Sequence, residues 1–257
     1  KKQKVCERVP MQSVSRTDKG SYLVDLGREV VGFATLSFKT PEVQTLRVAY
    51  GESLTGVHVR DAIHDRHFFF EYTAKKGQNE FTDHMLRLGC RYLEIFCTYP
   101  IEIGYIGILP QVYEIKAIPH KLKSEDEQRI YDASVNTLRL CMMEHYVDTP
   151  WREQCLYVYD SRNQALCGYH VFDEGNAEYV RANLKLISQD RREDGLLSIC
   201  YPCGMDLTIP SFSLYYFMQV KEYLQFTGDL SLGEEVYEKL LSVLDVFIKN
   251  RKDGLVW

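Results

Sequence analysis

Three acids, an arginine and a tryptophan fall within one short stretch, DTPWREQCLYVYD, which runs from Asp148 to Asp160. Pro150 should end any preceding helix, and a helix that resumes near Gln154 would have Glu153 at its entrance. Glu153 and Asp160 are seven residues apart, about two helical turns, so both carboxylates would lie on one face. Asp148 can approach the same point from the loop. The spacing therefore predicts a cluster of carboxyl groups at the start of a helix.

Such a cluster has a recognisable chemistry. Carboxyl groups crowded beside aromatic rings disfavour full ionisation, so the pKa of one of them should rise. A protonated carboxyl beside ionised ones is how glycoside-cleaving sites keep a general acid at neutral pH. The same residues are also compatible with a structural role, since an Asp before Pro is often a cap or turn and a Glu in a first helical turn complements the helix dipole. Arg152 can then simply pair with Glu153.

The elements that must hold this segment change in kind along the chain. From residue 21 to about 118, runs rich in β-branched and aromatic residues are separated by Gly and Pro, which is typical of short antiparallel strands. This pattern predicts a β-sandwich. The expected strands cover residues 22–26, 30–38, 43–50, 68–73, 92–97 and 111–118.

After Pro119 the pattern becomes helical. Ser124, followed by three acids, is a good helix N-cap. Two Asp-Gly turns, at 194–195 and 253–254, each follow a predicted helix and lie 59 residues apart, which points to stacked or toroidal helix pairs. We expect helices from 124 to about 143 and over 154–172, 174–189, 209–226 and 232–249, and therefore two domains, 1–118 and 119–257.

Composition excludes several classes of protein. The net charge is −5 with no dominant basic patch, which argues against nucleic acid as a partner, and no apolar run is long enough to cross a membrane. The eight cysteines are irregularly spaced, which favours reduced thiols and a cytoplasmic setting. Cys200 and Cys203 form one C-x-x-C, but a zinc site would want a second pair or histidines nearby. We therefore expect no metal and no cofactor.

The acid-bearing segment also resembles the signature of the α-L-rhamnosidases, family 78 of the glycoside hydrolases. That signature usually reads Asp-Cys-Pro-x-Arg followed by one or two acids, and it is carried here by Asp148, Pro150, Arg152, Glu153 and Asp160. A threonine stands where the family usually has the cysteine, and one acid follows the arginine. Residues 145–147, 207–214 and 226–229 fit the same family, as do 25–33, 50–52 and 91–95 in the predicted sandwich. The resemblance runs from about residue 21 to the end and is strongest over 145–230.

This resemblance implies a fold and a mechanism. It implies a β-sandwich followed by part of an (α/α)6 barrel, and hydrolysis of terminal α-L-rhamnosyl glycosides with inversion, within carbohydrate metabolism. Glu153 corresponds to the general acid, while Asp148, Arg152 and Asp160 match positions that hold the sugar hydroxyls. The general base would lie beyond residue 257, so we expect this chain to be an inactive fragment whose open barrel edge favours a homo-oligomer.

Some questions stay open at this stage. Trp151 and Tyr157 are candidates for the apolar wall around the sugar's methyl group, but each is equally compatible with a core position. The sandwich fits a sugar-binding module or a structural support, of which we favour the second. Other readings of the whole chain are an (α/α)6 glycosidase for another sugar, a non-catalytic carbohydrate-binding protein, and a thiol or zinc protein built on Cys200 and Cys203.

Overall fold

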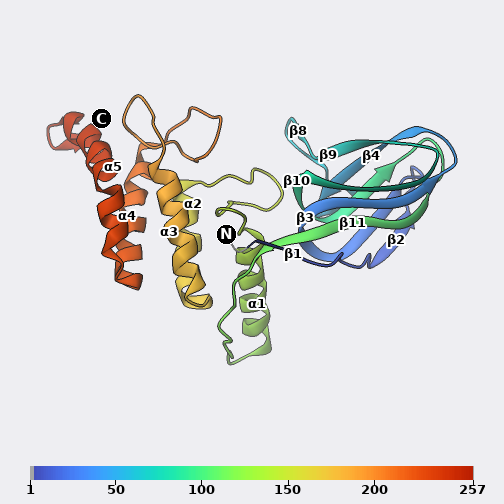
Figure 1. Cartoon of the computed structure of the whole chain (residues 1–257), viewed down its shortest axis with the longest axis horizontal. Helices are drawn as coiled ribbons and strands as arrows, with labels where there is room; N and C mark the ends of the chain where they lie inside the picture. Colours follow the sequence, from blue (N-terminus) through green and yellow to red (C-terminus); the bar gives the residue numbers. More distant parts are fainter. Residues whose placement is uncertain (1–2, 257) are drawn as a thin grey trace. The chain divides into compact units, whose positions relative to one another are not determined.

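The chain forms two compact units in the computed structural model, which describes residues 3–256. The β unit contains Gln3–Tyr113 together with Pro150–Arg152, and the helical unit contains Glu114–Thr149 and the residues from Glu153 onward. The change of unit after Tyr113 lies slightly earlier than the sequence suggested. Figure 1 shows the strands of the β unit and the helices α1 to α5 of the helical unit. The three residues 150–152, from the middle of the acid-bearing segment, thus belong to the β unit.

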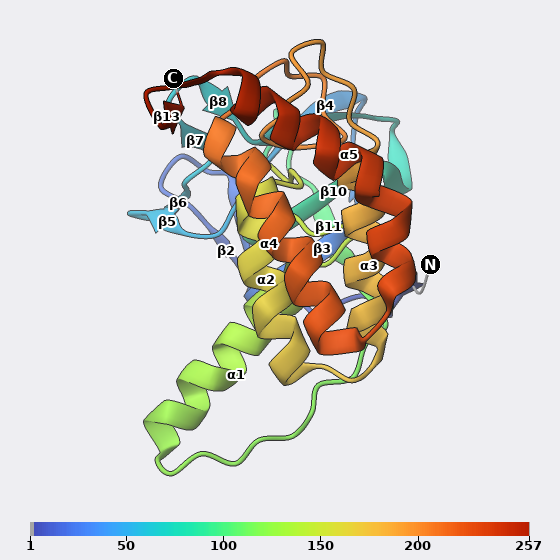
Figure 2. The ribbon, with the colours of Figure 1, turned by 90° about the vertical axis from the view of Figure 1, so that its left-hand side faces the viewer.

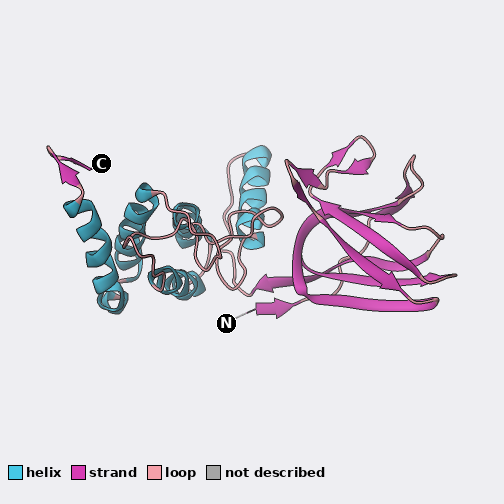
Figure 3. Cartoon of the chain, turned by 90° about the horizontal axis from the view of Figure 1, so that it is seen from above, coloured by secondary structure: helices cyan, strands magenta, loops and turns pink. Residues whose placement is uncertain are grey.

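The β unit is built on one seven-stranded antiparallel sheet, seen from above in Figure 3. Its strand order is β1-β11-β3-β10-β4-β9, and β2 pairs with β3 outside this path. Short hairpins, β5 with β6 and β7 with β8, stand apart from the sheet. The bounds are β1 Gln3–Val5, β2 Ser13–Arg16, β3 Tyr22–Thr40, β4 Gln44–Gly51, β5 Leu54–Thr55, β6 His58–Val59, β7 Ala62–Ile63, β8 Arg66–His67, β9 Phe69–Ala74, β10 Gly77–Phe96 and β11 Glu102–Tyr113.

Two long strands turn this sheet into a sandwich. The first part of β3 pairs with β2 and with the end of β10, which continues to β4 and β9. The second part of β3 pairs with β11 and with the start of β10. Because β3 and β10 run through both halves, apolar side chains from each half meet in one core. Leu36, Phe38, Leu46, Ile95 and Ile106 are all buried there. The predicted β-sandwich is confirmed.

The structure corrects several strand boundaries. Residues 22–26 and 30–38 were expected as separate strands, but β3 runs through both, and Gly27 adopts a positive φ of 76° that its lack of a side chain permits. The β10 strand begins at Gly77, well before the predicted start at residue 92. Its first half is rich in polar residues, so the sequence there lacks the apolar alternation of a half-buried strand. The β11 strand ends at Tyr113, where a strand over 111–118 was expected.

The helical unit contains five helices among the described residues, and no helix of that part is long and apolar enough to cross a membrane. The predicted N-cap at Ser124 is confirmed, because its hydroxyl accepts from the Glu127 amide and the Glu127 carboxylate accepts from the Ser124 amide. Helix α4 packs against α2, α3 and α5 (Figure 2). The bounds are α1 Glu125–Leu140, α2 Val158–Val171, α3 Gly175–Ser188, α4 Pro210–Thr227 and α5 Leu230–Lys249, followed by a hairpin of β12 Arg251–Lys252 and β13 Leu255–Val256.

Candidate active site

A closed loop carries the acidic residues of the signature segment. The Asp148 amide donates to the Cys155 carbonyl at 3.1 Å, and the Cys155 amide donates back to Asp148 Oδ1 at 3.0 Å. Within this loop Gln154 has a positive φ of 53°, uncommon for a residue with a side chain, and the Glu153 amide donates to Thr149 Oγ1 at 3.4 Å. Backbone and side-chain bonds together therefore fix where the Glu153 side chain begins.

The predicted start of the next helix was wrong. A helix was expected from Gln154, but α2 begins at Val158. The residues before it instead pair with a distant segment: the Val158 amide donates to the Ile199 carbonyl at 3.0 Å, and the Tyr201 amide donates to the Leu156 carbonyl at 3.2 Å. Glu153 consequently lies in the loop, and the argument that it shares a helical face with Asp160 does not hold.

The carboxyl groups nevertheless gather, for a different reason. Burial raises the pKa of Asp148. The hydrogen bond from the Cys155 amide lowers this pKa in part, and the hydrogen bond with the Glu153 carboxyl group raises it again. Burial also raises the pKa of Asp160, with a smaller contribution from the negative charge of Glu153. Asp148 and Asp160 both interact with Glu153, which places Glu153 at the centre of the cluster. The loop supplies two of these acids and the first turn of α2 supplies the third.

Tyr157 is a further member of this cluster, and its role was missed at the sequence level. It was considered as part of an apolar wall or of the core, but its phenol is hydrogen-bonded to the Glu153 carboxyl group. Burial is the main cause that raises the pKa of Tyr157, and the charge of Glu153 adds to it. The phenol thus lies against the Glu153 carboxyl group and holds it in place. The spacing of four residues between Glu153 and Tyr157 gave no signal of this bond.

Trp151 and Arg152 lie in the β unit. The Trp151 indole is only 6% exposed and belongs to the sandwich core, with its ring centroid 4.5 Å from that of Phe68. A Cβ at Gly89 would lie 2.2 Å from the Pro150 carbonyl oxygen, so β10 must carry a glycine where this segment passes. This burial argues for packing by Trp151 rather than for contact with a sugar. Burial raises the pKa of Glu52, and the positive charge of Arg152 offsets part of this rise.

The architecture defines a class before it defines a family: a β-sandwich followed by helical hairpins that carry crowded carboxyl groups is the arrangement of a six-hairpin glycosidase. The profile of the bacterial α-L-rhamnosidase 6 hairpin glycosidase domain matches residues 122–257, and that of the bacterial α-L-rhamnosidase concanavalin-like domain matches residues 15–102. The chain belongs to the bacterial α-L-rhamnosidase family. No curated protein sequence matches this chain.

Solved structures have the same fold. The GH78 rhamnosidase of Bacillus sp. GL1 superposes with a TM-score of 0.81 at 24% identity, over 93% of this chain and 26% of that one. The rhamnosidase from Klebsiella oxytoca with rhamnose bound superposes with a TM-score of 0.78 at 22% identity, over 96% of this chain and 52% of that one. The α-L-rhamnosidase of Dictyoglomus thermophilum superposes with a TM-score of 0.82 at 20% identity, over 99% of this chain and 30% of that one. The chain thus spans between about a quarter and a half of the length of these structures.

Proposed function

We propose that this chain carries the acid-bearing part of an inverting α-L-rhamnosidase site, with Glu153 as the general acid. The observation that carries the proposal is the convergence of Asp148, Asp160 and Tyr157 on the Glu153 carboxyl. The carboxyl groups of Asp148 and Asp160 and the phenol of Tyr157 surround the Glu153 side chain, and together they support its placement as the proton donor. A carboxyl group that retains its proton is what the departing glycosidic oxygen requires.

The remaining roles follow from the same chemistry. In our proposal Asp148, Arg152 and Asp160 accept from or donate to the sugar hydroxyls, and so orient the glycosidic bond toward Glu153. Inversion further requires a carboxylate that activates water on the opposite face of the sugar, roughly 6.5–9.5 Å from the acid. The family resemblance assigns that base to no residue of this chain. We therefore propose that hydrolysis needs a base outside residues 1–257, and that this chain alone has little activity.

The experiment uses a full-length family member with substitutions at the positions equivalent to Glu153→Gln, Asp148→Asn and Asp160→Asn, and Glu71→Gln as an exposed control in the β unit. Each of the first three should lower kcat/KM by about 10²-fold or more on an α-L-rhamnoside with a poor alcohol leaving group, while the control should match the parent. Proton NMR of the first product formed by the parent should show the β-anomer. Parent-like turnover in the three variants would show that these acids do not carry the reaction, absence of turnover in the parent would favour a non-catalytic carbohydrate-binding protein, and an initial α-anomer would exclude inversion.

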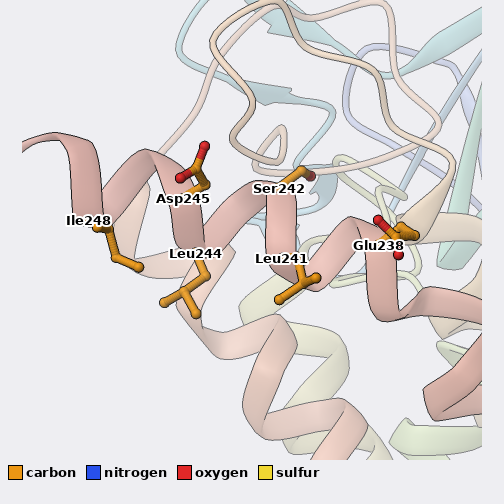
Figure 4. Close-up of a pocket in the computed structure, with 6 residues that line it drawn as sticks. All are labelled: Glu238, Leu241, Ser242, Leu244, Asp245 and Ile248. Atoms are coloured by element: carbon orange, nitrogen blue, oxygen red, sulfur yellow. The ribbon is translucent and has the colours of Figure 1, made fainter.

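We also propose that an apolar stripe on α5 is where two copies of this chain associate. Tyr237, Leu241, Leu244 and Ile248 recur at helical spacing and are each at least 40% exposed. Figure 4 shows Leu241, Leu244 and Ile248 projecting from one side of α5. Such a contiguous stripe favours association. Light scattering should give a dimer for the chain and a monomer for the double variant Leu244→Asp, Ile248→Asp; a monomer for both would exclude this contact.

The cellular setting remains part of the proposal. All eight cysteines are free thiols, which supports the cytoplasmic location inferred from their spacing. We propose a rhamnose-containing glycoside as the substrate, with neither nucleic acid nor a membrane as a partner.

A further inference from the structure

Three thiols of the helical unit lie together beside the acid-bearing loop. The sulfur atoms of Cys155, Cys200 and Cys203 are all within 4.8 Å of one another. Cys200 and Cys203 form the C-x-x-C pair that lacked a partner in the sequence, and the third thiol comes from a segment far away in the chain. A β-bridge between Tyr157 and Cys200 brings the two segments side by side. The cluster therefore results from the fold rather than from sequence proximity.

The three thiols differ in exposure in a way that suits a ligand site. Cys200 is buried, Cys155 is half-buried, and Cys203 is exposed, so the cluster has an anchored inner end and an open outer end. Each of the three is a free thiol.

We propose that Cys155, Cys200 and Cys203 form a binding site for a thiophilic divalent metal ion such as Zn²⁺. Zinc–thiolate bonds of about 2.3 Å in a tetrahedral arrangement place the sulfur atoms about 3.8 Å apart. The cluster needs to contract by about 1 Å at most to reach that geometry. Three soft sulfur ligands select zinc or cobalt over magnesium and calcium, which prefer oxygen.

The binding step is an exchange of protons for a metal ion. Each S–H bond breaks and its proton passes to solvent, one sulfur–metal bond forms in its place, and no atom changes oxidation state. A water molecule that enters past exposed Cys203 fills the fourth position. The hydrogen bond from the Cys155 thiol to the Glu153 carbonyl, at 3.3 Å, is lost when that thiol ionises.

A metal ion at this site would link the segment that carries Cys155 to the segment that carries Cys200 and Cys203. The Cys155 amide closes the loop by donating a hydrogen bond to Asp148 Oδ1, while Cys203 anchors the turn after Cys200, where its sulfur accepts from the Met205 amide at 3.3 Å. Metal binding should therefore stabilise the helical unit against unfolding, because the ion binds the folded arrangement in preference to the unfolded chain. This inference depends on the thiol cluster alone and not on the proposed glycosidase activity.

The test is a titration of the reduced, metal-free chain with Co²⁺, followed by absorption spectroscopy. The site should give sulfur-to-cobalt charge-transfer bands and the visible bands of tetrahedral cobalt, saturating at one ion per chain, and Zn²⁺ should remove them. Cys203→Ser is the main variant, since an exposed side chain is least needed for folding. It should weaken Co²⁺ binding by about 10–100-fold or more, and Cys155→Ser should do the same. Cys167→Ser, which removes an exposed thiol outside the cluster, should bind as the parent does.

Three results would overturn the proposal: no charge-transfer bands in the reduced chain, unchanged bands in both Cys203→Ser and Cys155→Ser, or loss of the bands in Cys167→Ser. If the reduced chain binds no cobalt and thiol titration after air exposure shows two thiols fewer, the cluster is a disulfide pair instead. Circular dichroism should be measured for each variant to establish that it is folded. The melting temperature of the parent should rise with Zn²⁺ and that of folded Cys203→Ser should not, whether or not the chain hydrolyses any glycoside.

Discussion

The β unit surrounds its buried carboxylate with donors, whereas the helical unit sets carboxyl groups against one another. Glu94 is 1% exposed, and its two oxygens are bonded to Ser21 Oγ at 2.5 Å, to His58 Nδ1 at 2.7 Å and to the Val59 amide at 3.0 Å. Around Glu153, by contrast, lie the carboxyl groups of Asp148 and Asp160. We therefore expect the partners of a buried acid, more than its burial, to distinguish a structural carboxylate from one that transfers a proton.

The largest expected effect concerns activity. If, as we propose, the base lies outside residues 1–257, the purified chain should hydrolyse a chromogenic α-L-rhamnoside at least about 10⁴-fold more slowly than a full-length family member, because both base catalysis and the positioning supplied by that region would then be missing. Initial rates at matched enzyme concentration measure this difference. Comparable turnover would mean that these residues contain the base, or that a second copy supplies it.

Removal of the donor-surrounded acid should cost stability. Glu94→Ala leaves the buried Ser21 hydroxyl and Val59 amide and the half-buried His58 ring without their acceptor, so the free energy of unfolding should fall by about 3 kcal/mol. Urea denaturation followed by circular dichroism measures it, with the exposed Glu71→Ala as the control, expected within about 0.5 kcal/mol of the parent. If the two variants were equally stable, the hydrogen bonds around Glu94 would contribute nothing to stability, and Glu94 would not be a structural carboxylate.

Glu29 tests the same rule within the β unit, because it is a half-buried acid without donors. Its Oε1 has no hydrogen-bond partner among the described residues, and burial raises its pKa to about 8. The folded chain therefore retains a proton that the unfolded chain releases above about pH 4.5, so stability falls as the pH rises from there to about 8. Glu29→Gln should remove this fall and stabilise the chain by about 1–3 kcal/mol at neutral pH.

Urea unfolding at about pH 5 and about pH 8 checks the sign of this effect. The advantage of Glu29→Gln over the parent should be small at the lower pH and larger at the higher one. A constant difference between the two, or a variant that is less stable at the higher pH, would show that Glu29 ionises freely in the folded chain.

The smallest effect is expected in the acid cluster. Asp160→Asn removes one of the crowded charges, but it also removes a favourable charge at the start of α2. The two effects oppose each other, so the free energy of unfolding should rise by at most about 1 kcal/mol. Chemical denaturation of this variant beside Glu94→Ala measures how differently the two acids contribute to the free energy of unfolding. A loss as large as that of Glu94→Ala would make Asp160 a structural acid.

The sequence allowed much of the fold to be predicted, because helix periodicity and caps are local. Ser124 and its following acids marked the start of α1 within one residue. The start of α2 was wrong because the bonds that hold Leu156 and Val158 come from residues 199–201, far away in the chain. For the same reason the sequence contained no sign that Cys155 would join Cys200, or that Trp151 would pack in the sandwich core.

Proton donation by Glu153 is tested most directly by how the effect of its removal depends on the leaving group. The measurement compares kcat for the Glu153→Gln equivalent and the parent, in a full-length family member, on two α-L-rhamnosides. On a rhamnoside with a poor alcohol leaving group the loss should be about 10²–10⁴-fold, whereas on an activated aryl rhamnoside, which departs without protonation, it should be about 10-fold or less. Equal losses on the two substrates would contradict the assignment, because they would show that Glu153 acts on both through a step other than proton transfer to the leaving group.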